Sequence, residues 1–222
     1  MQVTIDSPSG QLAAVLEMPE GVEQAPGVVI IHEIFGLTDS IKETAREFAT
    51  IGYAALAVDL IGSSNKTLCM FKLFSQMIAK PLDNPTLRSL RAALEYLQDI
   101  PGVDPERIGA VGFCMGGGFS IAWAATDPRV KAVAPFYATN PRPLSAVSRV
   151  CPLVGSYPDK DFTTGAGRKL DRQLQLAGVD HDIKIYPGTK HSFFNSPRNA
   201  VEEDAKKDAW QRMVTFFDER LK

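Results

Sequence analysis

Apolar residues in this chain gather into short runs, and between the runs they recur at three- and four-residue spacings. Short, continuous apolar runs are typical of strands buried on both faces, as in a parallel sheet. We interpret as strands the runs at residues 12–18, 27–31, 54–58, 108–111, 132–135, 153–155 and 182–186.

The segments between these runs have the spacing of amphipathic helices. Leu87, Leu90 and Leu94 fall on one helix face, and Asn84 followed by Pro85 is a typical helix start. Further helices are predicted from Asp39 or Ser40 to about residue 51, and over residues 116–126, 165–177 and 200–221. Because strands and helices alternate, we expect one α/β domain over residues 1–222, with a mostly parallel central sheet and helices on both faces.

The segment 60–84 follows a predicted strand and differs from the rest of the chain. It joins a short Gly-Ser-Ser-Asn stretch to an apolar stretch rich in Met, Phe and Leu. One interpretation is a short helix packed on the core. The other is a lid or pocket wall over an active site, because functional loops in α/β proteins follow the carboxyl ends of strands.

Charge and cysteine content narrow the function classes. With 24 basic and 26 acidic residues the net charge is −2, so we expect neither nucleic acid nor a membrane surface as partner. No apolar run is long enough to span a bilayer, and the first residues do not read as a secretory leader. Cys69, Cys114 and Cys151 fit neither a disulfide framework nor a zinc site, and the histidines add no ligand cluster. We therefore expect a cytoplasmic protein without a metal or organic cofactor.

Candidate chemistry begins at Cys114, in the stretch Gly112-Phe113-Cys114-Met115-Gly116 between a predicted strand and a predicted helix. This is the nucleophile-elbow pattern of α/β-hydrolases with sulfur in place of oxygen. The turn is so tight that side chains at Gly112 and Gly116 would collide. A helix N-terminus favours thiolate, and the Met115 N–H is a natural oxyanion donor. The alternative is a buried structural cysteine in a glycine-rich turn.

A cysteine nucleophile needs a base and an acid that orients it. His191 lies in a turn directly after a predicted strand, where a catalytic imidazole belongs, whereas His181 lies at the other end of that strand. Asp159 and Asp161 both follow the strand at 153–155, so the chain order is cysteine, aspartate, histidine. This is the order of the α/β-hydrolase fold.

Three stretches resemble the dienelactone hydrolase family, and the resemblance covers essentially the whole chain. They are His32-Glu33-Ile34-Phe35-Gly36, Gly112-Phe113-Cys114-Met115-Gly116-Gly117 and the stretch from Tyr186 to Phe193.

The resemblance implies an α/β-hydrolase fold with Cys114 as nucleophile, His191 as base and Asp161 as orienting acid, so that Asp159 faces solvent. It also implies oxyanion donors from the backbone of Ile34 and Met115. Glu33 would contact the thiol and control its ionisation, with helix capping or an ion pair as the simpler alternative. Phe35 and Arg198 would contact substrate. Family members use arginines to hold a substrate carboxylate, one of them four residues after the histidine, and that position is Asn195 here.

The leading hypothesis is a hydrolase that cleaves a small ester or lactone, as a carboxymethylenebutenolidase does, through an acyl-cysteine intermediate. A second hypothesis is a general carboxylesterase or thioesterase acting on apolar esters, which the Met- and Phe-rich segment would suit. A third is a non-catalytic thiol sensor on the same scaffold. The physiological substrate and the oligomeric state do not follow from the sequence.

Overall fold

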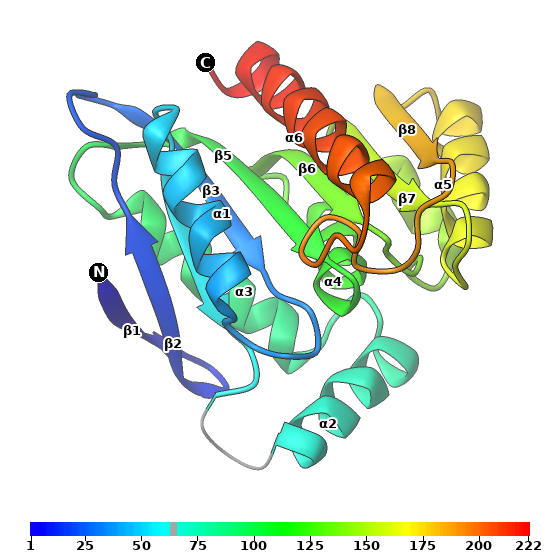
Figure 1. The fold of residues 1–222 in the computed structure, drawn as a ribbon. Helices are drawn as coiled ribbons and strands as arrows, with labels where there is room; N and C mark the ends of the chain where they lie inside the picture. Colours follow the sequence, from blue (N-terminus) through cyan, green and yellow to red (C-terminus); the bar gives the residue numbers. More distant parts are fainter. Residues whose placement is uncertain (63–65) are drawn as a thin grey trace.

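The computed structural model describes residues 1–62 and 66–222, and a sheet of eight strands forms its centre (Figure 1). The strand order is β1-β2-β4-β3-β5-β6-β7-β8. The strands are β1 (Gln2–Ser7), β2 (Gly10–Glu17), β3 (Ala25–Ile31), β4 (Ala54–Asp59), β5 (Val103–Phe113), β6 (Val130–Phe136), β7 (Leu153–Pro158) and β8 (His181–Tyr186). From β4 onward along the sheet all neighbours are parallel, whereas β2 pairs antiparallel with both β1 and β4 at one edge. The predicted, mostly parallel sheet is confirmed.

Strand β1 was not predicted, because it lacks an apolar run. Only Ile5 of its six residues is buried, and the others face solvent or the rim of the sheet. It pairs with β2 at the sheet edge, where one side chain suffices to anchor it to the core.

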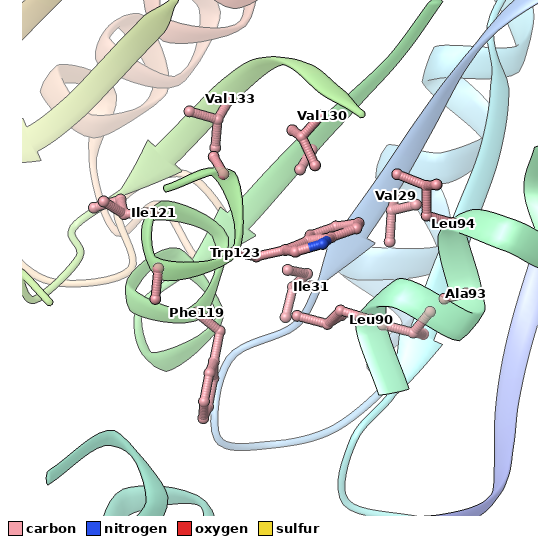
Figure 2. Close-up of a cluster of buried hydrophobic side chains, with 14 of the residues drawn as sticks. Val29, Ile31, Leu90, Ala93, Leu94, Phe119, Ile121, Trp123, Val130 and Val133 are labelled. Atoms are coloured by element: carbon pink, nitrogen blue, oxygen red, sulfur yellow. The ribbon is translucent and has the colours of Figure 1, made fainter. Parts of the chain in front are cut away.

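Helices cover both faces of the sheet. They are α1 (Asp39–Thr50), α2 (Lys66–Ala79), α3 (Pro85–Gln98), α4 (Met115–Ala124), α5 (Thr164–Ala177) and α6 (Ala200–Leu221), with a 3-10 helix at Leu144–Arg149. Helices α1 and α6 pack on one face and α3, α4 and α5 on the other. Figure 2 shows the second face, where Trp123 of α4 lies beside Leu90 of α3 and Ile31 of β3.

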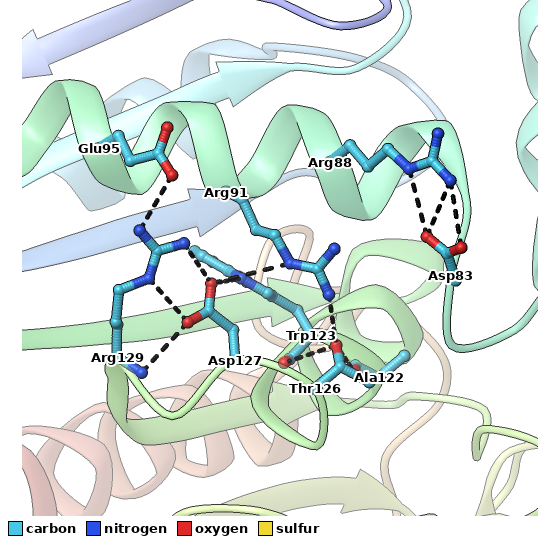
Figure 3. Close-up of polar contacts among 9 residues, drawn as sticks. All are labelled: Asp83, Arg88, Arg91, Glu95, Ala122, Trp123, Thr126, Asp127 and Arg129. Carbon is cyan, nitrogen blue, oxygen red and sulfur yellow. Dashed lines mark hydrogen bonds and ion pairs between the residues drawn. The ribbon is translucent and has the colours of Figure 1, made fainter.

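An ion-pair network around the buried Asp127 ties the end of α4 to α3 (Figure 3). Asp127 follows α4, is 4% exposed, and accepts hydrogen bonds from Trp123 Nε1 at 3.2 Å and Arg129 Nη2 at 2.8 Å. Arg129 also donates to Glu95 of α3 at 3.0 Å. Since each charge is paired, the network holds the carboxyl end of α4 without leaving a buried group unsatisfied. The opposite end of α4 carries Cys114.

The segment 60–84 contains helix α2, and residues 63–65 lie outside the described part. Leu73 is buried against the core, and a Cβ at Gly118 in the first turn of α4 would overlap Met77. Phe71 and Ile78 on the outer face are 74% and 70% exposed. A helix packed on the core is thus present, while its role as a lid stays a prediction. Among the described helices none is both long and apolar enough to cross a membrane.

Candidate active site

Cys114 lies on a sharp turn between β5 and α4, at the carboxyl edge of the sheet (Figure 1). Its backbone has φ 54° and ψ −113°, a conformation that side-chain-bearing residues rarely adopt. A Cβ on Gly112 would overlap the Gly116 carbonyl, and a Cβ on Gly116 would overlap the carbonyls of Ile31 and His32. Both glycines are therefore required for α4 to begin this close to β5 and β3.

The Cys114 thiol is held neutral. The pKa of Cys114 is raised to about 11, chiefly by burial and also by the charges of Glu33 and Asp161, while a hydrogen bond from the Met115 N–H opposes them. From the sequence we expected Glu33 to control the ionisation of this thiol, against the helix N-terminus, which favours thiolate. Burial and the two carboxylates outweigh that effect in the folded protein.

His191 and Asp161 form a hydrogen-bonded pair. His191 lies in the loop after β8, and its Nδ1 is 2.7 Å from Asp161 Oδ2. Asp161 also accepts hydrogen bonds from Thr163 Oγ1 and from the Phe162 N–H at 2.7 Å. Although burial favours the neutral acid, these bonds outweigh it and lower the pKa of Asp161. An ionised Asp161 fixes the imidazole by Nδ1 and leaves Nε2 for chemistry.

Two aromatic rings that the sequence did not single out flank His191. Tyr137 lies with its ring centroid 4.9 Å from the imidazole, and Phe162 stacks on it at 5.0 Å with an interplanar angle of 22°. Phe162 is 73% exposed, so its ring forms part of the surface beside the pair. Tyr137 follows β6 with φ 37°, which no local pattern in the sequence foretells.

Glu33 is buried between the thiol and the histidine loop. It directly follows β3, is 6% exposed, and accepts a hydrogen bond from Ser192 Oγ at 2.6 Å. Burial and the charge of Glu33 together raise the pKa of Tyr137 well above its usual range. Glu33 therefore faces Cys114, Ser192 and Tyr137, and within the described residues no cation forms an ion pair with it.

The remaining predicted site residues are spread around this centre. Ile34 packs partly buried against the core, and Phe35 beside it is 60% exposed. We expected Asp159 to face solvent. Its Oδ1 is instead buried and has no hydrogen-bond partner. Arg198 is not brought to the thiol: its guanidinium is bonded to Glu202, with Nε 2.8 Å from Oε2. Asn195 contacts the first turn of α1, with Oδ1 accepting from Ser40 Oγ at 3.4 Å.

The other two histidines are placed away from this chemistry. His32 is fully buried, and its Nε2 accepts the Leu60 N–H at 2.9 Å. His181 lies at the start of β8, at the amino end of the strand, opposite to the end where Cys114 lies. Its Nε2 is 3.4 Å from Asp171 Oδ1. Residues 1–62 and 66–222 contain no cluster of three or more His, Cys, Asp or Glu side chains that could hold a metal ion.

The eight-stranded sheet and the strained residue between β5 and α4 define an α/β-hydrolase. A model of the dienelactone hydrolase family matches residues 12–221, and the chain belongs to that family of hydrolases.

Similar proteins span the whole chain. One from Saccharolobus solfataricus, which carries the name of a carboxymethylenebutenolidase, is 30% identical over 97% of both chains. Another of that name, from Synechocystis, is 29% identical over 99% of this chain and 96% of its own. A crystal structure from Klebsiella pneumoniae, described as a dienelactone hydrolase, has a TM-score of 0.84 at 26% identity, covering 98% of this chain and 97% of its own.

Proposed function

We propose that this chain hydrolyses a small ester or lactone through an acyl-cysteine intermediate on Cys114. The observation that carries the proposal is the 2.7 Å bond from His191 to Asp161 at the edge of the sheet where Cys114 occupies its strained turn. Family membership supports the same chemistry. A positioned imidazole beside an activated nucleophile is the arrangement that acyl transfer requires.

In the acylation step, substrate binding moves the thiol proton to Glu33, and the thiolate attacks the carbonyl carbon. The Ile34 and Met115 N–H groups stabilise the oxyanion. In this cycle His191 starts as an imidazolium held by the Asp161 carboxylate. As the carbon–oxygen bond breaks, it gives its Nε2 proton to the leaving oxygen and becomes neutral.

In the deacylation step, His191 removes a proton from water, and the resulting hydroxide attacks the thioester. The carbon–sulfur bond breaks, and the thiolate recovers its proton from Glu33. Glu33 is then a carboxylate again, and His191 carries the proton taken from water. Each cycle therefore consumes one ester and one water and restores both side chains.

The apolar surface beside His191 supports a second candidate, an esterase for apolar esters. Phe162 and Phe35 are exposed next to the pair and the oxyanion segment, and α2 adds Met77 near the first turn of α4. Apolar rings favour an uncharged acyl or leaving group.

A thiol sensor is the less supported reading. Sensor cysteines are exposed and have a low pKa, whereas burial and two carboxylates raise the pKa of Cys114 to about 11. The low and odd number of cysteines also supports a reducing, cytoplasmic location, which we propose together with the function.

The direct experiment is a panel of 4-nitrophenyl esters and small lactones, assayed with the wild type and with Cys114→Ala. We expect Cys114→Ala to lower kcat/KM by at least about 10⁴-fold, because the covalent route is lost. Circular dichroism confirms that the variant is folded. Retention of the wild-type rate would refute the proposal.

A further inference from the structure

The first turn of α6 holds a buried carboxylate that serves the histidine loop. Glu202 is 1% exposed and accepts hydrogen bonds from the Lys190 N–H at 3.0 Å and the Arg198 N–H at 2.9 Å. Arg198 adds two side-chain bonds to Glu202, from Nε and Nη2, both at 2.8 Å. All the lone-pair directions of this carboxylate therefore point at the segment from residue 190 to 198.

Arg198 continues the contact to His191 itself. Its Nη2 donates to the His191 carbonyl oxygen at 2.8 Å as well as to Glu202. The Glu202–Arg198 pair thus binds the backbone on both sides of the imidazole: Glu202 accepts the Lys190 N–H, and Arg198 donates to the His191 carbonyl. An Arg fork suits this task because its planar donors bind two acceptors at fixed angles.

The pair has a reason to be charged. Burial favours a neutral Glu202, but the bonds from Arg198 and Lys190 outweigh it and lower the pKa of Glu202. Asn199 caps α6 by accepting the Glu202 N–H at 3.0 Å, which places the carboxylate in the positive first turn of the helix.

The loop also needs restraint. Ser192, directly after His191, has φ 60°, a left-handed conformation that costs free energy for any residue other than glycine. The Ser192 hydroxyl donates to Glu33, and the carbonyl of the residue before it, His191, accepts from Arg198. These two bonds add to the backbone bonds of the loop, from the Phe193 N–H to the Lys190 carbonyl at 3.2 Å and from the Ser196 N–H to the Ser192 carbonyl at 2.9 Å, in holding the imidazole at its distance from Asp161.

We propose that Glu202 and Arg198 are positioning residues that set the place of the His191 imidazole. The proposal rests on the proposed function, in which His191 transfers the protons. It assigns Arg198 to the histidine loop, in place of the substrate contact expected from the sequence. Neither residue touches the reacting atoms, and both act through His191.

The first test measures kcat per active site in Glu202→Gln and Arg198→Lys, with sites counted by electrophile titration of Cys114. Gln keeps the shape but loses the charge, and Lys keeps the charge but loses the fork. We expect kcat to fall by about 10²-fold in Glu202→Gln and by less in Arg198→Lys, because a small misplacement of a catalytic group costs about that much. KM should change little. Wild-type kcat per titrated site in both variants would overturn the proposal, since a purely structural role lowers only the number of sites.

Asp218→Asn is the matched control. Asp218 lies at the other end of α6, where it accepts a hydrogen bond from Tyr53 at 2.8 Å and is 2.9 Å from Lys222. Its loss removes carboxylate bonds from the same helix without touching the histidine loop. Its kcat per site should equal that of the wild type.

The second test combines Glu202→Gln with His191→Ala and supplies free imidazole. Once the tethered imidazole is gone, Glu202→Gln should change the imidazole-dependent turnover no further. A drop of the same factor as in the wild-type background would overturn the positioning role. Unchanged turnover in His191→Ala alone would instead refute the proposed function, so the two failures are distinguishable. If the double variant does not fold, the titrated kcat of Arg198→Lys decides alone, because this exchange keeps the charge of the pair.

Discussion

Replacing Glu33 by Gln should make the resting thiol more reactive and the enzyme slower. Glu33 faces Cys114 as a buried negative charge, and its carboxylate is the proposed acceptor of the thiol proton. Gln removes the charge and the basicity while it keeps the size of the side chain. The two roles thus predict opposite effects on two measurable rates.

The size of the effect follows from the pKa of Cys114. At a pKa of about 11, about one thiol in 10³ is ionised at pH 8. The ordinary value is 9.0, and burial is the largest cause of the rise, so removing the charge of Glu33 should reverse only part of it. Each pKa unit by which the thiol falls gives about ten times more thiolate. Because a thiolate of lower pKa is a weaker nucleophile, alkylation at pH 8 should rise by about threefold for each such unit.

The assay follows the alkylation of Cys114 by iodoacetamide between pH 7 and 11 (about the range in which the thiol ionises), with the modified peptide identified by mass spectrometry. Turnover of the best ester is measured in parallel and should fall by about 10²-fold, as expected when a proton acceptor is lost. Asp159→Asn is the control, because Asp159 is a carboxylate near the site that does not contribute to the pKa of Cys114. Superimposable alkylation curves for Glu33→Gln and the wild type would remove Glu33 from the mechanism.

Three further predictions follow from the charges of the site. Asp161→Asn should lower kcat by about 10⁴-fold, because an amide stabilises the wrong imidazole tautomer. The kcat of Asp159→Asn should stay near that of the wild type. The reverse result would mean that Asp159, and not Asp161, orients His191. Glu202, whose pKa is lowered from 4.5, contributes stability that is present above that value and lost as the pH falls below it. Urea titrations from pH 6 to about 3 should therefore show a weaker acid destabilisation in Glu202→Gln, and parallel curves would contradict this. The kcat/KM for a neutral ester should be at least about tenfold higher than for an ester of equal length with an added carboxylate, because Glu33 and Asp161 repel an anion. Equal kcat/KM values for such a pair of esters would argue against this repulsion.

The parts of the site that the sequence predicts are those built by local geometry. Cys114 could be found because the flanking glycines are required by the turn itself, and His191 because it lies in the turn that follows a strand. These features depend on a few consecutive residues.

Contacts between loops from different strands were not predictable. Tyr137 follows β6 and Phe162 follows β7, and they meet at the imidazole only because those strands and β8 are neighbours in the sheet. The depth of burial of Cys114 and the approach of Asp161 to it also depend on packing, whereas the helix N-terminus and the motif that brings Glu33 to the thiol are visible in the sequence.

The role of Arg198 shows how nearness to a motif leaves the function of a side chain open. Its proximity to His191 in the chain suggested a substrate contact. Folding places Glu202 under the same loop, one helical turn further along, and the two charges bind each other and the His191 carbonyl.

The central claim is that acyl transfer passes through Cys114, and trapping the intermediate tests it most directly. The enzyme is mixed with a 4-nitrophenyl ester, quenched in acid within the first turnover, digested and analysed by mass spectrometry. We predict an acyl group on the peptide that contains Cys114. In His191→Ala this acyl-enzyme should live longer, because deacylation needs the imidazole. Steady ester hydrolysis by the wild type with no acyl group on Cys114 in either protein, or with the acyl group on another residue, would contradict the account.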